Sequence, residues 1–124
     1  MPIAQRKKGP IHSIIKDTGK PSITYFELIE AFHNYSLLKV VPHTGRPNQI
    51  RLHLAAIGHA IINDPLYNKK GSKIIGKDGI LIIDRLALHS HKITFMHPKN
   101  NSNMTLTAPL SFDFFNAIEF LKKQ

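Results

Sequence analysis

The chain has 124 residues, of which 42% are hydrophobic, with no cysteine and a net charge of +9. This length allows one domain with a buried core, and the hydrophobic fraction excludes a disordered chain. Without cysteine there can be no disulfide, cysteine-ligated zinc site or thiol nucleophile, which fits a reducing cytoplasm. We therefore expect a cytoplasmic protein whose positive charge favours a polyanion as partner: RNA, DNA or an anionic membrane surface.

Residues 1–20 carry the segments RKKGP and DTGKP, with a short apolar piece between them. The first ten residues lack the apolar core of a signal peptide, and no apolar run in the chain is long enough to cross a membrane. We expect residues 1–20 to form a solvent-exposed basic arm or linker and residues 21–124 to form the folded domain.

Two segments rich in β-branched and aromatic residues follow, at 22–30 and 35–41, with His33-Asn34 between them. Such residues favour strands, and asparagine suits a turn. We predict a β-hairpin whose second strand delivers the chain to a tight turn at Thr44-Gly45.

A helix is predicted over residues 47–57. Pro47 suits the first helical turn, where its missing N–H is not needed. Gly58 suits the position just after the helix, because glycine adopts the left-handed backbone found there. The spacing of the apolar residues predicts a buried stripe formed by Ile50, Leu54 and Ile57.

Arg46 and Arg51 lie on either side of the predicted helix start. A helix N-terminus presents unpaired N–H groups, and guanidinium groups bind phosphate oxygens, so we expect an anion site here with phosphate as its biological ligand. Gln49 and His53 share a second face of the helix, beside Arg51.

After the helix, Asp64 is expected to accept a hydrogen bond from its own downstream backbone in a turn. The loop at 68–79 is rich in lysine and glycine, and it either follows an RNA backbone or is simply a mobile loop. Its clustered lysines are Lys69, Lys70 and Lys73.

Strand-like runs occupy residues 80–83, 86–95 and 104–108. The H-x-H spacing of His89 and His91 can bind a metal, but no carboxylate lies at a supporting spacing, so we expect packing and backbone hydrogen bonds and no metal site. A last helix is predicted at 112–123, capped by Ser111. Its apolar stripe is expected to be Phe112, Phe115, Ile118 and Leu121. The whole predicts an α+β fold, a mostly antiparallel mixed sheet with packed helices.

Several blocks occur together in one order: TGR at 44–46, QIR at 49–51, GH at 58–59 and RLALHSHKITFMHP at 85–98. They resemble the RluA-type pseudouridine synthases, of the large-subunit RluC/RluD-like kind, over residues 18–114. The resemblance implies an enzyme that isomerises uridine in RNA, with ribosomal RNA as the expected substrate, and that needs no cofactor.

In that family the arginine of QIR pairs with a catalytic aspartate, so the resemblance gives this role to Arg51. Leu88 would pack near the target base. With RNA as the partner, the expected contact residues are Arg46, Gln49, His53, Lys69, Lys70 and Lys73.

The family's catalytic aspartate lies in a motif, HRLDxxTSG, that these 124 residues do not contain. Asn48 also replaces the histidine that precedes QIR in the family. The chain therefore resembles the C-terminal half of a catalytic domain. Three interpretations stay open: a partial synthase domain, a catalytically inactive RNA-binding remnant, or an interaction protein that completes a site with another chain. An apolar face left open on such a half predicts self-association.

Overall fold

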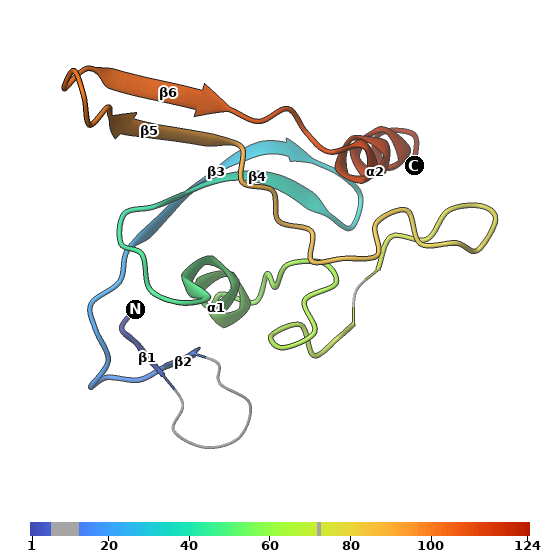
Figure 1. Cartoon of the computed structure of the whole chain (residues 1–124). Coiled ribbons are helices and arrows are strands. Elements are labelled where there is room, and N and C mark those ends of the chain that lie inside the picture. Colours follow the sequence, from blue (N-terminus) through green and yellow to red (C-terminus); the bar gives the residue numbers. More distant parts are fainter. Residues whose placement is uncertain (6–12, 72) are drawn as a thin grey trace.

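The computed structural model describes residues 1–5, 13–71 and 73–124 (Figure 1). In this part of the chain three antiparallel strand pairs, β1-β2, β3-β4 and β5-β6, accompany two helices. The α+β prediction is confirmed, although the strand pairs stay separate and do not join into one sheet among the described residues. The elements are β1 (Ile3–Gln5), β2 (Ser13–Ile15), β3 (Thr24–Ala31), β4 (Ser36–Pro42), α1 (Gln49–Ala56), β5 (Lys92–Met96), β6 (Asn103–Thr107) and α2 (Phe112–Lys122).

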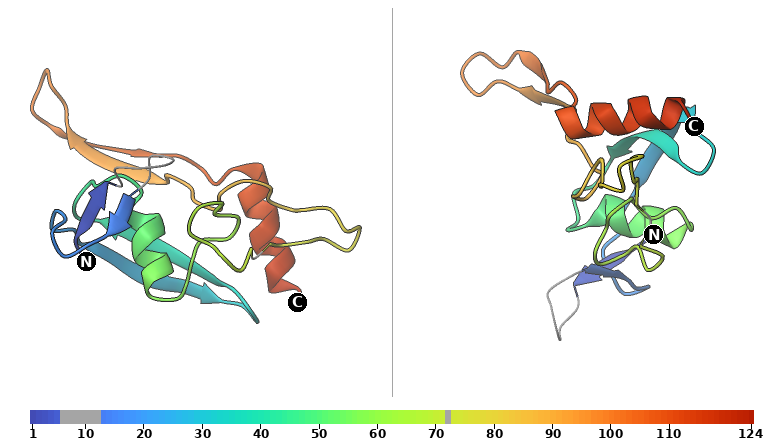
Figure 2. Two further views of the ribbon diagram at one scale, coloured as in Figure 1. Left: turned by 90° about the horizontal axis from the view of Figure 1, so that it is seen from below. Right: turned by 90° about the vertical axis from the view of Figure 1, so that its right-hand side faces the viewer.

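The N-terminal strands β1 and β2 form a short hairpin beside α1 (Figure 2). Ile3 is buried, and it exchanges two backbone hydrogen bonds with Lys20, at 2.9 and 3.0 Å. The terminal ammonium of Met1 donates to the carbonyl of Ser22 at 3.1 Å. The described flanks of the expected basic arm are therefore anchored to the fold, while the basic run at 6–10 lies outside the described residues.

The predicted hairpin is confirmed as β3 and β4, closed by a hydrogen bond from Phe32 N to the carbonyl of Tyr35 at 2.8 Å. Phe26 pairs with Val40, and the neighbouring pair joins Tyr25 to Val41. Successive pairs in a ladder point to opposite faces. Since Tyr25 and Phe26 are both largely exposed, each face of the hairpin presents apolar surface to solvent.

Helix α1 begins two residues later than predicted, at Gln49. Gln49 N donates to the carbonyl of Arg46 at 3.1 Å, and Asn48 has a left-handed backbone with φ of 57°. Proline followed by a left-handed residue is the arrangement of a type II turn, which asparagine tolerates. Pro47 therefore belongs to a turn that precedes the helix.

The end of α1 is as predicted. Gly58 has φ of +84°, its N–H donates to the carbonyl of Ala55 at 3.0 Å, and His59 N donates to that of Leu54 at 2.9 Å. This pair of bonds is a Schellman motif, which satisfies carbonyls that the helix end would otherwise leave unpaired.

The buried face of α1 differs from the predicted stripe. Leu52 and Leu54 are buried, but Ile57 is 45% exposed and Ile50 is only partly covered. Two polar residues, Gln49 and His53, face inward instead. They are buried because hydrogen bonds satisfy their polar groups, both with Thr24 of β3 and with groups outside the hairpin, as described below.

A hydrophobic cluster lies between α2 and the segment at 74–83, and its buried members are Ile74, Ile83, Ala117 and Leu121. The predicted stripe of α2 is wrong at its first two positions, because Phe112 is 80% and Phe115 51% exposed. A spacing of three residues falls short of a helical turn, so Phe112 and Leu121 lie on opposite sides of the helix. Phe114, Ala117 and Leu121 form the stripe that packs.

The strand predicted at 80–83 is wrong, since only an isolated bridge joins Ile75 to Leu81. The run at 86–95 becomes a strand only from Lys92, while the predicted strand at 104–108 is confirmed as β6. His89 and His91 both hydrogen-bond to the carbonyl of Ala108, at 3.2 and 2.8 Å, which confirms the expected backbone bonds.

Two features are absent from the residues that the structure describes. No group of three or more His, Cys, Asp or Glu side chains among them could hold a metal ion. No helix among them is long and apolar enough to cross a membrane.

Candidate functional site

An ion pair between Arg51 and Asp64 joins the first turn of α1 to the loop that follows the helix. Arg51 Nε donates to Asp64 Oδ2 at 2.8 Å, and Arg51 Nη2 donates to Oδ1 at 2.6 Å. The Asp64 side chain has no solvent exposure, whereas 17% of the Arg51 side chain is exposed. A bidentate pair of this kind fixes the plane of the guanidinium as well as its position.

Asp64 is also held by its own turn, as predicted. Its Oδ1 accepts the backbone N–H of Leu66 at 2.9 Å and that of Tyr67 at 3.2 Å. Burial raises the pKa of Asp64, but the hydrogen bonds from Arg51 and from these two N–H groups outweigh burial and hold the pKa below its ordinary value. The hydrogen bond to Asp64 likewise raises the pKa of Arg51. The pair is therefore ionised at neutral pH.

Two further side chains surround the Arg51 guanidinium. The Tyr67 ring lies beneath it, with the guanidinium carbon 5.2 Å from the ring centroid, in a cation–π contact. Arg51 Nη1 donates to Asn48 Oδ1 at 3.3 Å. Asn48 in turn donates to the Tyr67 hydroxyl at 3.4 Å, and that hydroxyl donates to the carbonyl of Ser13 at 2.8 Å. Asn48, which replaces the family's histidine, thus contacts Arg51 directly.

Gln49 holds the turn that carries Arg46. Its Oε1 accepts the Thr44 hydroxyl at 2.6 Å and the Arg46 N–H at 3.1 Å. Its Nε2 donates to the carbonyl of Ile23 at 2.8 Å and to the Thr24 hydroxyl oxygen at 2.9 Å. All four hydrogen-bonding positions of the amide are therefore filled by protein groups, and Gln49 is 4% exposed.

His53 continues the same network. Its Nε2 lies 2.9 Å from the carbonyl oxygen of Met1, and its Nδ1 lies 2.7 Å from the Thr24 hydroxyl. A carbonyl only accepts, so Nε2 carries the proton and Nδ1 accepts from Thr24. His53 is 6% exposed. Gln49 and His53 were expected to contact RNA, but the structure turns both inward, where they support the turn from behind.

Arg46 remains at the surface of this turn. Its Nε and Nη2 donate to the carbonyl of Pro21 at 3.3 and 3.2 Å, which holds one edge of the guanidinium against the chain that leads into β3. The side chain is partly exposed. The sequence prediction that Arg46 binds an anion stays a prediction.

Leu88 lies in the half-buried segment before β5, and Arg85 fixes this segment to α2. Arg85 Nη1 donates to the Leu88 carbonyl at 3.3 Å. Its Nε donates to Asp113 Oδ2 at 2.9 Å and its Nη2 to Ser111 Oγ at 2.8 Å. The hydrogen bond from Arg85, followed by that from Ser111, lowers the pKa of Asp113 to about 2. This ion pair positions the segment that carries Leu88.

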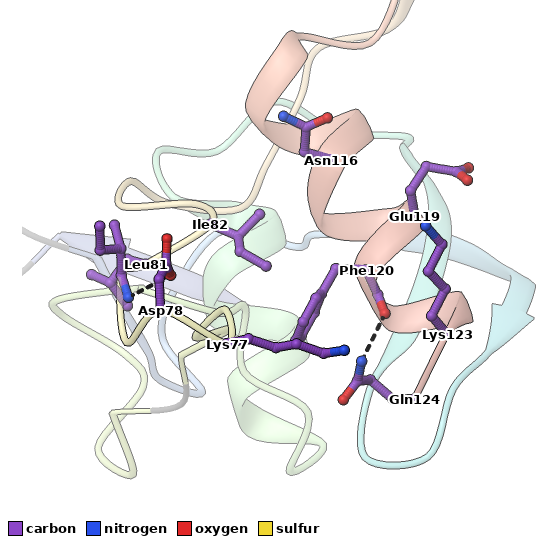
Figure 3. A pocket seen from close by; sticks show the side chains of 10 residues that line it. Lys77, Asp78, Leu81, Ile82, Asn116, Glu119, Phe120, Lys123 and Gln124 are labelled. Carbon is purple, nitrogen blue, oxygen red and sulfur yellow. Dashed lines mark hydrogen bonds between the residues drawn. The ribbon is translucent and has the colours of Figure 1, made fainter.

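Two hollows lie elsewhere, between α2 and the segment at 73–82. The larger has a volume of about 740 Å³, with Lys77, Phe120 and Lys123 among its lining residues (Figure 3). The smaller, about 330 Å³, includes Lys73. Neither contains Arg46 or Arg51, so the hollows and the predicted chemistry lie in different places. We place the candidate site by charge and hydrogen bonding, around Arg51.

The structure thus brings only part of the predicted set together. Arg46, Gln49, Arg51 and His53 lie on one turn and helix. The loop lysines are exposed, namely Lys69, Lys70 and Lys73. Asp64 was not predicted from the sequence as the partner of Arg51. The turn signal at Asp64-Pro65 located this carboxylate, but nothing in the spacing showed which side chain it would meet.

Comparisons with known proteins place the chain in a family. The family model for RNA pseudouridylate synthase matches residues 1–56. Ribosomal large subunit pseudouridine synthase C of Buchnera aphidicola subsp. Acyrthosiphon pisum is 42% identical over 103 residues, which are 83% of this chain and 32% of that protein. Ribosomal large subunit pseudouridine synthase D of Haemophilus ducreyi is 35% identical over 126 residues, covering 98% of this chain and 39% of that protein.

Ribosomal large subunit pseudouridine synthase D of Escherichia coli K12 is 30% identical over the same length, with 98% of this chain and 39% of that protein covered. The chain therefore belongs to the pseudouridine synthases, in the RluA-type family. It spans between 32% and 39% of the length of these relatives. The family expectation from the TGR, QIR and RLALH blocks is confirmed.

Proposed function

We propose that this chain is part of the catalytic domain of an RNA pseudouridine synthase that acts on a uridine of ribosomal RNA. The observation that carries the proposal is the position and exposure of Arg51, the arginine of the QIR block. It is fixed at the start of α1, its side chain is partly exposed, and its terminal nitrogens still have N–H groups to donate. The names of the relatives support ribosomal RNA as the substrate class.

In the expected reaction the glycosidic bond of the uridine breaks, the uracil turns, and its C5 is joined to the ribose. The catalytic carboxylate would come from a segment that carries HRLDxxTSG, in this polypeptide or another, and Arg51 would orient it. The target base must leave its stack to be reached. Leu88 would pack against it, while Gln49 and His53 would hold the turn from behind.

Phosphate contacts would fall to the exposed basic residues. Guanidinium and ammonium groups supply most of the affinity of such proteins for nucleic acid, and that affinity falls steeply with salt. The net charge of +9 supports RNA as the partner. The residues proposed for the RNA backbone are Arg46, Lys69, Lys70 and Lys73.

The β3–β4 hairpin supports a complementary segment. Tyr25 and Ile29 are exposed on this hairpin, as are Phe26 and Leu28, although strands with apolar side chains on both faces normally lie inside a larger sheet. The missing cover would come from the remainder of a synthase domain. Without it, the exposed surface would drive self-association.

Reconstitution tests the proposal. The chain would be combined with the part of the Buchnera synthase C that lies outside its match to this chain, and added to ribosomal RNA labelled with tritium at uridine C5. Joining C5 to the ribose releases the tritium, so we expect release only when both polypeptides are present. Arg51→Ala should abolish it.

Two other outcomes would change the conclusion. Salt-sensitive RNA binding without tritium release in any combination would support the inactive RNA-binding remnant. If the chain neither binds RNA nor supports tritium release, the proposal is overturned.

A further inference from the structure

We propose that Asp64 is a positioning residue, which holds one edge of the Arg51 guanidinium so that the remaining N–H groups face an incoming carboxylate. Tyr67 assists through a cation–π contact with the same group. This inference rests on the proposed function, because the carboxylate would be the catalytic aspartate supplied by the complementary segment.

The hydrogen bonds of Arg51 define which edge is occupied. A guanidinium carries five N–H groups. Asp64 takes one from Nε and one from Nη2, at 2.8 and 2.6 Å, and Asn48 takes one from Nη1 at 3.3 Å. One N–H on each terminal nitrogen therefore has no acceptor among the residues that the structure describes. These two groups can pair with a second carboxylate while Asp64 stays in place.

Asp64 can serve as a fixed support because it does not depend on Arg51 for its own position. Its Oδ1 is held by the N–H groups of Leu66 and Tyr67 within the turn, and its side chain has no exposure to solvent. If the buried Asp64 carboxylate moved out of this turn, it would lose several hydrogen bonds at once. The acceptor for Arg51 is therefore built into the loop.

Tyr67 restricts the guanidinium in the remaining direction. The guanidinium carbon lies over its ring, 5.2 Å from the ring centroid, in a cation–π contact. The ring itself is tethered, because the hydroxyl donates to the carbonyl of Ser13 at 2.8 Å. The edge contact from Asp64 and the face contact from Tyr67 together define one orientation of Arg51.

Such support matters because an unrestrained arginine side chain samples many rotamers. Restricting it to one rotamer costs conformational entropy, and that cost weakens a bidentate pair with a new carboxylate. Asp64 also neutralises the charge of Arg51. Arg51 would then orient the second carboxylate more than it attracts it. Loss of Asp64 should therefore damage turnover while leaving, or even strengthening, the attraction of the site for an anion.

The first test follows Arg51 itself, in the 124-residue chain, by the NMR signal of its Nε–H. We expect this proton to exchange slowly with solvent in the wild type and quickly in Asp64→Asn, with no change in Asp84→Asn, a matched variant of an exposed aspartate. Asp64→Glu keeps the charge but displaces the oxygens, and it should also lose protection. Equal exchange in wild type and Asp64→Asn would overturn the inference, whether or not the chain is an enzyme.

The second test uses the reconstituted enzyme. Misplacing a reacting group by about 1 Å can cost about 10²-fold in rate, so Asp64→Asn should lower kcat by about that factor while KM for RNA stays the same or falls. Unchanged kcat, or an equal loss in Asp84→Asn, would refute the positioning role. If the wild type shows no activity, the proposed function fails, and the exchange measurement alone then decides whether Asp64 holds Arg51.

Discussion

Replacing Gln49 by alanine tests whether the buried amide network holds the arginine-bearing turn. The substitution removes the partner of four groups, namely the Thr44 and Thr24 hydroxyls, the Arg46 N–H and the Ile23 carbonyl. A net hydrogen bond contributes about 0.5–1.5 kcal/mol. The Thr44 hydroxyl can rotate toward another acceptor, and the Thr24 hydroxyl keeps its hydrogen bond to His53. Water can also reach part of the turn, so we expect a loss of about 2–4 kcal/mol in the free energy of unfolding. That is a large share of the roughly 5–15 kcal/mol typical of a domain.

Urea unfolding, followed by circular dichroism, measures this loss. Gln124→Ala is the matched control, because the Gln124 side chain makes one exposed hydrogen bond, to the carbonyl of Phe120 at 3.2 Å. Its removal should cost less than about 0.5 kcal/mol. If Gln49→Ala costs no more than the control, the network does not hold the turn and our account of the buried polar face of α1 is wrong.

Four further predictions follow from the same structure. Gly58→Ala should lower the free energy of unfolding by about 1 kcal/mol, since the left-handed backbone there is unfavourable for alanine. Gly45→Ala should be nearly neutral, because an added Cβ meets nothing within 4 Å at that position. Equal losses for the two variants in thermal melts would contradict this. Because the pKa of Asp113 is lowered from 3.8 to about 2, its carboxylate stabilises the fold at pH values above 3.8, and this contribution is lost as the pH falls to about 2. Asp113→Asn should flatten that part of a stability–pH curve, and an unchanged slope would count against the ion pair. Arg46→Ala combined with Arg51→Ala should weaken RNA binding and reduce its dependence on salt, measured by filter binding across a salt series, and undiminished binding would misplace the site. The isolated chain should self-associate through its apolar hairpin, so light scattering that reports a monomer at every concentration would refute that expectation.

Sequence signals that act over a few neighbouring residues were reliable. The hairpin at 22–41 rests on the strand preference of its residues, and it is confirmed. The glycine after α1 and the turn at Asp64 each rest on the backbone preference of a single residue, and both are confirmed. The α+β fold and the family also follow from local patterns and from blocks read in order. These features depend little on what lies across the molecule.

Predictions that required knowing a distant partner failed. Pro47 suits a helix start as well as a turn, and only the left-handed backbone at Asn48 places it in the turn. The apolar spacing of α1 could not show that Gln49 and His53 face inward, because burial of a polar side chain depends on hydrogen-bond partners elsewhere in the chain.

The sequence by itself determined the family, the basic character and the presence of Arg51 in the QIR block. Only the tertiary structure decided what Arg51 contacts. Its acceptor, Asp64, lies thirteen residues away and across a helix end, and the loop geometry that brings them together is set by the Schellman turn at Gly58 and by the packing of the following loop. Two charges attract at short range, but chain topology determines which charges come within that range.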